Sequence, residues 1–118
     1  MNVEVYELHG TPVAEMRSEG IVIRTARDAA DVARQLLERG ITKLILSEKN
    51  LCPEMWQISN GLAGAIAQEF GDRAITVALV GGFSKDKGKH IQDFIEKQSG
   101  NRFAFVASSE LGKTYLSQ

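Results

Sequence analysis

Apolar and polar side chains alternate over residues 3–8, and this period of two predicts a half-buried strand. The segment His9–Pro12 contains a glycine and a proline, which interrupt regular structure and predict a turn. A second short strand over about residues 13–16 would complete a hairpin. The apolar run at residues 21–23 is short and favours a strand over a helix, so a third short strand is expected there.

Apolar residues then recur at a helical spacing, which predicts an amphipathic helix with one buried face. Thr25 or Asp28 is placed to cap the start of this helix, and Gly40 is placed to end it. The residues expected on the buried face are Ala29, Val32, Ala33, Leu36 and Leu37.

Beyond this helix, apolar segments alternate between the strand and the helix pattern. Residues 41–46 are almost continuously apolar, as expected of a strand covered on both faces. Pro53 is placed to open a helical turn, because a first helical position needs no backbone N–H. The further expected elements are a helical stripe over 58–70 that Gly71 ends, a strand over 75–80, a helix over 91–95 that closes near Gly100, a strand over 103–106 and a helix over 109–116.

This order of elements predicts a single α/β domain over residues 1–118. Strands that alternate with helices are typical of parallel strands joined by crossover helices. Right-handed crossovers place the helices on the faces of the sheet. We therefore expect a mixed sheet of five or six strands, with an N-terminal hairpin followed by parallel strands, and about four helices.

Composition narrows the class of protein. The chain has 14 Lys and Arg against 15 Asp and Glu, and a protein with no basic excess is a poor candidate for general nucleic-acid binding. One cysteine excludes an internal disulfide, and with two histidines it is too sparse for a convincing zinc site, so we expect neither metal nor cofactor. The N-terminus is acidic, unlike a signal peptide, and no apolar run reaches the roughly 18 residues of a membrane span. The expected location is the cytoplasm.

The loop from Gly81 to Lys89 follows a strand and precedes a helix, where an open α/β sheet binds its ligands. Its glycines let the backbone approach a ligand, and its lysines add positive charge. The spacing is neither that of a P-loop nor that of the dinucleotide fingerprint. A solvated turn is the alternative interpretation. The candidate anion-binding residues are Gly81, Gly82, Ser84, Lys85, Lys87 and Lys89.

A second candidate segment surrounds Ser59, with Asn60 and Gly61 beside it. The stretch from Ser59 to Leu62, following an apolar strand, resembles the phosphorylated segment of the anti-sigma factor antagonists, which belong to the STAS-like group. The resemblance implies a β-rich start followed by alternating helices and strands, and it implies phosphorylation at Ser59. Ile58 and Asn60 differ from that segment's usual residues. The simpler interpretation of Ser59 is a helix N-cap.

A resemblance that covers nearly the whole chain rests on four short motifs in order. They are Glu48-Lys49-Asn50-Leu51, Gly61-Leu62-Ala63-Gly64, Val80-Gly81-Gly82-Phe83-Ser84-Lys85 and Asp93-Phe94-Ile95. These motifs resemble a small bacterial family known only as a domain of unknown function, so this likeness supports the fold and implies no activity.

Single residues with reactive side chains are best interpreted as structural. Cys52 is expected to be buried and inert, because free cysteine is among the most buried residue types. Trp56 is expected in the core and His90 on the surface. Glu48 and Lys49 are expected to form a solvated pair of little energetic weight.

The sequence therefore favours a non-enzymatic regulatory or protein-interaction domain with a protein partner and a phosphorylation switch at Ser59. The alternative is a small-anion or nucleotide-binding protein that uses the loop from Gly81 to Lys89. An enzyme ranks third, because no complete set of acid, base and nucleophile is visible. The N-terminal hairpin leaves a sheet edge that could pair in a homodimer.

Overall fold

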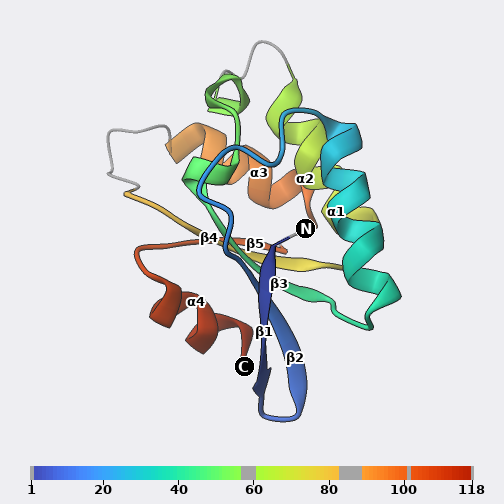
Figure 1. Cartoon of the computed structure of the whole chain (residues 1–118). Helices are drawn as coiled ribbons and strands as arrows, with labels where there is room; N and C mark the ends of the chain where they lie inside the picture. Colours follow the sequence, from blue (N-terminus) through green and yellow to red (C-terminus); the bar gives the residue numbers. More distant parts are fainter. Residues whose placement is uncertain (1, 57–60, 83–88, 101, 118) are drawn as a thin grey trace.

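The structure is a computed structural model that describes residues 2–56, 61–82, 89–100 and 102–117 (Figure 1). Five strands form one sheet in the order β1-β2-β3-β4-β5, with β1 antiparallel to β2 and every other neighbouring pair parallel. The strands are β1 (Val3–Leu8), β2 (Thr11–Met16), β3 (Lys43–Ser47), β4 (Thr76–Val80) and β5 (Phe103–Val106). The helices are α1 (Ala26–Glu38), α2 (Leu62–Asp72), α3 (Lys89–Gln98) and α4 (Ser109–Leu116), with short 3₁₀ turns η1 (Glu48–Asn50) and η2 (Pro53–Trp56). The expected mixed α/β fold is confirmed.

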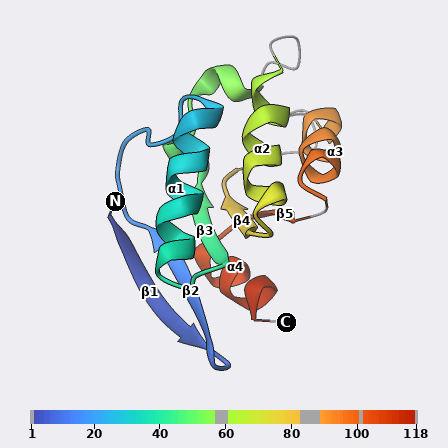
Figure 2. The ribbon, with the colours of Figure 1, turned by 90° about the vertical axis from the view of Figure 1, so that its right-hand side faces the viewer.

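Helices cover both faces of the sheet unequally. Figure 2 shows α1, α2 and α3 side by side over one face, whereas α4 packs on the other face against β3, β4 and β5. Three successive crossovers that advance in one direction across a sheet, all right-handed, place their helices on the same face. No helix among the described residues is long and apolar enough to cross a membrane.

The central strands are apolar on both faces, as the nearly continuous apolar run predicts. In β3, Leu44 and Leu46 join the large core under α1 and α2, whereas Ile45 joins a small cluster under α4. β4 repeats this alternation, because Ala78 belongs to the small cluster. The small cluster also contains Val13 and Leu116. Each side chain's face thus follows from the two-residue period of a strand.

The N-terminal hairpin has a two-residue turn. His9 (φ 53°) and Gly10 (φ 80°) both have positive φ, which matches the type I′ turn of tight hairpins. β2 therefore begins at Thr11, and the expected turn over His9–Pro12 is wrong at its second half. Pro12 is tolerated inside β2 because the described pairing of β2 with β3 begins at Ala14.

The first helix begins and ends as expected. The Thr25 hydroxyl accepts a hydrogen bond from the backbone N–H of Asp28, and Asp28 in turn accepts one from the backbone N–H of Arg24. Gly40 follows the helix with φ 72° and donates to the Leu37 carbonyl. These contacts satisfy backbone groups that a helix end leaves free.

Three expected boundaries are wrong. Residues 21–23 form only an isolated parallel bridge, between Ile23 and Leu51, rather than a strand. Gly61, with φ 69°, is the N-cap of α2, so the cap expected at Ser59 lies elsewhere. Gly71 lies within α2, where a Cβ would come within 2.7 Å of the Ser99 carbonyl oxygen. Its lack of a side chain lets α2 and the end of α3 approach closely, which is why a glycine is needed there.

Candidate functional site

Long connections gather at one edge of the sheet. The connections that leave the carboxyl ends of β2, β3 and β4 span residues 17–25, 48–61 and 81–88, whereas those that enter β3, β4 and β5 span only 39–42, 73–75 and 99–102. Parallel strands place all their carboxyl ends at the same edge, and functional residues of α/β proteins concentrate there. We call this edge, with the described residues 17–25, 48–56, 61, 81 and 82 of these connections, the carboxyl edge.

Asn50 holds two of these connections together. Its fully buried side chain accepts a hydrogen bond from the Ser47 N–H (3.1 Å) and donates to the carbonyls of Ser18 (2.8 Å) and Gly20 (2.9 Å). Its own carbonyl accepts from the backbone N–H groups of Val22 (2.8 Å) and Ile23 (3.0 Å). Four of these five hydrogen bonds join the connection after β2 to the one after β3, and the fifth, from Ser47, fixes Asn50 within its own connection.

Glu48 reaches the third connection. A Glu48 carboxylate oxygen accepts a hydrogen bond from the backbone N–H of Gly82 at 3.3 Å. The solvated pair expected between Glu48 and Lys49 is wrong, because Lys49 pairs with Glu19 on the connection after β2 (2.9 Å). These two neighbouring residues thus reach in different directions, and together they tie the connections after β2 and β4 to η1.

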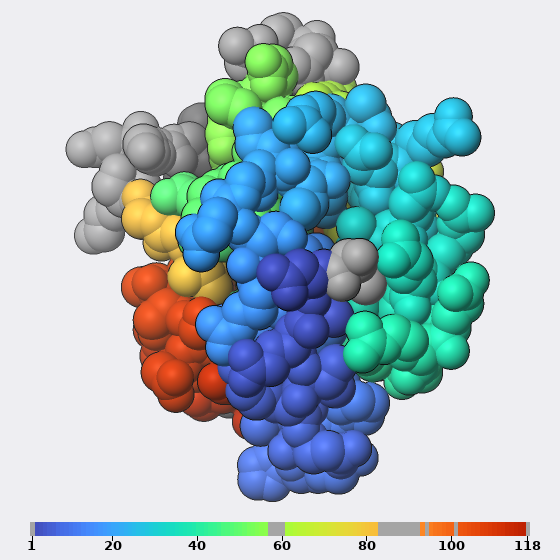
Figure 3. Space-filling view, in the orientation of Figure 1, coloured from blue at the N-terminus to red at the C-terminus, as the bar shows by residue number. Residues whose placement is uncertain are grey.

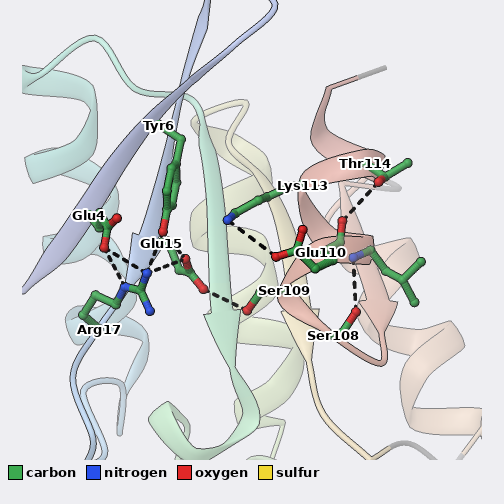
Figure 4. A network of polar contacts seen from close by, with 10 residues as sticks. Glu4, Tyr6, Glu15, Arg17, Ser108, Ser109, Glu110, Lys113 and Thr114 are labelled. Atoms are coloured by element: carbon green, nitrogen blue, oxygen red, sulfur yellow. Dashed lines mark hydrogen bonds and ion pairs between the residues drawn. The ribbon is translucent and has the colours of Figure 1, made fainter.

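A polar network lies on the α4 side of the same edge (Figure 4). Glu15, only 6% exposed, faces α4 from β2 and accepts hydrogen bonds from the hydroxyls of Tyr6 (2.9 Å) and Ser109 (2.8 Å). Arg17 lies 3.3 Å from the Glu15 carboxylate, donates to the Tyr6 hydroxyl (2.6 Å) and pairs with Glu4 (2.9 Å). β1, β2 and α4 therefore meet at one buried carboxylate, whose charge is balanced by a half-exposed guanidinium.

This network shifts the titration of its members. Burial, followed by the hydrogen bond to Glu15, raises the pKa of Tyr6 to about 12. The nearby Tyr6 hydroxyl, and after it Arg17, lower the pKa of Glu4, whereas the charge of Glu15 raises the pKa of Arg17. The Lys113 ammonium also lies 4.0 Å from the centre of the Tyr6 ring. At neutral pH the phenol is protonated and serves as the donor to Glu15.

A cavity of about 280 Å³ opens beside the network, at the ends of β2 and β3 and the start of α4. Two carboxylates, two cationic side chains and two hydroxyls line this cavity. Both cations are already paired, Arg17 with Glu4 and Glu15, and Lys49 with Glu19. Its polar lining consists of Glu15, Arg17, Glu19, Ser47, Lys49 and Ser109.

The strand order does not produce the ligand crevice that is expected at the loop from Gly81 to Lys89. Ligand crevices of open α/β sheets form where the strand order reverses and the helices change face. In this sheet the order never reverses, so α1, α2 and α3 stay on one face and no such crevice arises among the described residues.

The sequence-based site residues are only partly described by the structure. Gly61 caps α2, Gly81 and Gly82 follow β4, and Lys89 begins α3. The backbone N–H of Gly81 donates to the Val106 carbonyl (3.0 Å), and the N–H of Gly82 donates to the Glu48 carboxylate. The residues outside the described range are Ser59, Asn60, Ser84, Lys85 and Lys87. By sequence position, the two candidate segments belong to the connections that leave the carboxyl ends of β3 and β4.

The burial expected of Cys52 is confirmed, and the core position expected of Trp56 is met only in part. Cys52 is 5% exposed, and its thiol lies 3.5 Å from the Arg24 carbonyl. Trp56 is half-buried and packs against the large core. The described residues contain no group of three His, Cys, Asp or Glu that could hold a metal ion. The His90 side chain is not described.

Sequence reasoning missed the two residues that organise the edge, Asn50 and Glu15. Asn50 stands in the polar stretch that follows β3, and its burial depends on carbonyls about thirty residues earlier in the chain. The position of Glu15 was predictable from the sequence. It stands between apolar residues in a short strand, so its side chain faces the side of the sheet opposite to Ala14 and Met16. A charged residue at such a position needs buried partners.

The chain belongs to a family described as a domain of unknown function (DUF4180), whose model matches residues 8–116. No curated protein and no solved structure matches the chain in the other two comparisons. The expected membership in a family of unknown function is thus confirmed.

Proposed function

We propose that this member of the family is a non-enzymatic interaction module that binds a protein partner through the carboxyl edge of its sheet. The observation that carries the proposal is the asymmetry between the long connections at this edge and the short ones opposite. Short connections suffice to close the fold, so the additional chain at the carboxyl edge serves another purpose.

The hydrogen bonds around Asn50 and Glu48 support this interpretation. A binding surface made of loops loses less conformational entropy on association when those loops are already fixed. Four hydrogen bonds from Asn50 to the connection after β2, together with the bond from Gly82 to Glu48, join the described parts of three connections. Because the buried Asn50 bonds only to main-chain groups, its role is structural. It fixes the positions of the exposed residues around it.

We further propose a STAS-like relationship and a phosphorylation switch at Ser59. The observed order, a hairpin followed by alternating helices and strands, agrees with the order that this relationship implies. Ser59 belongs by its sequence position to the connection between β3 and α2, which leaves the carboxyl end of β3. A phosphate would add nearly two negative charges to that surface and repel an acidic or apolar partner.

Matched charge reversals test the binding surface. Arg24 and Lys49 are exposed on the carboxyl edge, whereas Arg34 and Arg39 are exposed on α1 and just beyond its far end. A protein partner captured by the wild-type chain from its native cell should be lost with Arg24→Glu/Lys49→Glu and kept with Arg34→Glu/Arg39→Glu. Equal capture by both variants, with unchanged melting temperatures, would refute the assignment of the surface.

The switch has its own test. The affinity for the captured partner should fall at least tenfold with Ser59→Asp and stay within twofold of wild type with Ser59→Ala. Equal affinities of the two variants would reject the switch while leaving the binding surface in place.

The cavity beside Glu15 favours a second candidate function, the binding of a small anion. An anion there would compete with the carboxylates that already pair with Arg17 and Lys49, which makes this the weaker candidate. A ligand at 100 times its dissociation constant would stabilise the fold by about 2.7 kcal/mol, so a thermal-shift screen of phosphorylated metabolites detects it. We expect no shift, and a reproducible shift that Lys49→Ala abolishes would favour this candidate.

A further inference from the structure

β1 is an edge strand whose outer side carries unused backbone groups. The N–H of Arg17 donates to the Asn2 carbonyl (2.8 Å), so Asn2 and Arg17 form a hydrogen-bonded pair of the antiparallel ladder. Such pairs alternate with non-hydrogen-bonded ones. The β1–β2 register therefore points the backbone groups of Val3, Val5 and Glu7 away from β2. Figure 3 shows β1, in dark blue, at the surface along its length.

The side chains of β1 divide by face. Val3 packs against the large core under α1, so Val3, Val5 and Glu7 face the α1 side of the sheet. Glu4 and Tyr6 face the α4 side, where the Glu15 network lies. Val5 is 39% exposed, one of the few large apolar side chains that the described part of the chain leaves so exposed.

We propose that β1 pairs antiparallel with β1 of a second copy of this chain, with Val5 opposite the partner's Val5. The pairing joins the two sheets across a twofold axis. Its backbone hydrogen bonds come from Val3, Val5 and Glu7 of each copy, and its side-chain contact is between the two exposed valines.

The hydrogen-bond pattern selects this register. In a twofold pairing, a residue whose backbone groups point away from β2 must lie opposite another such residue of the second copy. The twofold axis can therefore pass only through a residue, and not between two residues. Centring the axis on Val5 uses all three outward residues, with Val3 opposite the partner's Glu7. Centring it on Glu4 or Tyr6 uses only two within β1.

Charge selects the same register. Centring the axis on Glu4 would place two carboxylates opposite each other, which destabilises a pair of strands. Centring it on Val5 instead places Glu4 opposite the partner's Tyr6, whose hydroxyl accepts a hydrogen bond from the partner's Arg17. Each Glu4 then lies beside a positive charge of the other copy.

The α1 side of the junction supports the pairing. Strand pairing about an axis perpendicular to the sheet keeps both α1 helices on one face. Leu37 of α1, also 39% exposed, lies on the same side of the sheet as Val5. The second copy thus covers the exposed Val5 with an apolar partner.

Positional crosslinking tests the register directly. Two residues in a hydrogen-bonded antiparallel pair have Cα atoms about 5.5 Å apart, within the range of a disulfide. Under mild oxidation Val5→Cys should form a covalent dimer. Val3→Cys should not, because its partner lies four residues away along the strand, roughly 13 Å. The one native cysteine, Cys52, is buried and leaves the background clean.

A backbone variant tests the dimer itself. Val5→Pro removes an outward N–H and leaves the β1–β2 ladder intact, whereas Val5→Thr keeps the N–H. In native mass spectrometry we expect dimers for wild type and Val5→Thr, and monomers for Val5→Pro. A monomeric wild type, a dimer that persists in folded Val5→Pro, or equal crosslinking at Val3→Cys and Val5→Cys would overturn the proposal. If Val5→Pro does not fold, the crosslinking pair decides alone.

Discussion

The Glu15 carboxylate and the Ser109 hydroxyl lie 2.8 Å apart although 94 residues separate them along the chain. This contact joins the second strand to the first turn of the last helix, on the face that the other three helices leave uncovered. A small apolar cluster of Val13, Ile45, Ala78 and Leu116 lies between α4 and the sheet, and the contact adds a polar tie to it.

Loss of the Glu15 carboxylate should destabilise the fold. Glu15→Ala removes the acceptor of the Tyr6 and Ser109 hydroxyls and leaves Arg17 without its buried partner. We expect the free energy of unfolding to fall by about 2–3 kcal/mol, measured by urea denaturation. Glu19→Ala is the matched control, since that side chain is 89% exposed, and it should change stability by less than about 0.5 kcal/mol. Equal effects of the two substitutions would contradict the role of Glu15.

Asn50 should be the most sensitive residue of the carboxyl edge. Asn50→Ala leaves the Ser47 N–H and the carbonyls of Ser18 and Gly20 without partners, at a cost of about 2–4 kcal/mol. Asn50→Asp should also destabilise, because a carboxylate cannot donate to the two carbonyls. Hydrogen exchange should show faster exchange of the Val22 and Ile23 amides in both variants. Unchanged exchange there would contradict the proposed anchoring, and Asn2→Ala is the exposed control.

The raised pKa of Tyr6 should make stability fall at alkaline pH. The folded pKa is about 12 against an ordinary 10.0, so the stabilising contribution is complete below pH 10 and is lost as pH rises toward 12. In a Tyr115→Phe background Tyr6 is the only tyrosine, and phenolate absorbance reports its titration directly. Adding Tyr6→Phe should remove this part of the alkaline loss of stability. A folded-state titration near pH 10 would contradict the buried hydrogen bond to Glu15.

A glycine in place of Ala74, just after α2, should raise the stability of the fold. Ala74 follows α2 with φ 58°, the position that Gly40 occupies after α1. The residue after each of them closes the helix in the same way, with Ile75 donating to the Phe70 carbonyl and Ile41 to that of Leu36. A left-handed conformation costs an L-residue about 1 kcal/mol, so Ala74→Gly should raise the melting temperature and Gly40→Ala should lower it. Shifts in the same direction would contradict this account.

Local patterns predicted the elements of the fold well because those patterns follow from backbone geometry. The continuous apolar run in β3, the Thr25 cap and the hairpin each reflect a period or a turn that neighbouring residues determine. The failures share another cause. Residues 21–23 resemble a strand in composition, but the amides of Val22 and Ile23 donate to the Asn50 carbonyl, a partner far along the chain.

The candidate site was predictable only in position. The connections after β3 and after β4 leave the carboxyl ends of neighbouring parallel strands, as their strand-to-helix order indicates. The residues that organise this edge, Asn50 and Glu15, act through contacts between distant segments, which no local pattern encodes. Glu48 was likewise interpreted from its neighbour Lys49, whereas its hydrogen bond is to Gly82.

Site-specific photo-crosslinking from the carboxyl edge tests the central claim most directly. A photoreactive amino acid replaces Lys49 on that edge or, as the control, Arg39 beyond the far end of α1; both positions are exposed. In the native cell, we predict a discrete covalent adduct with a second protein from position 49 and none from position 39. Adducts of equal yield from both positions, or an adduct from position 39 alone, would contradict the claim that the carboxyl edge is the binding surface.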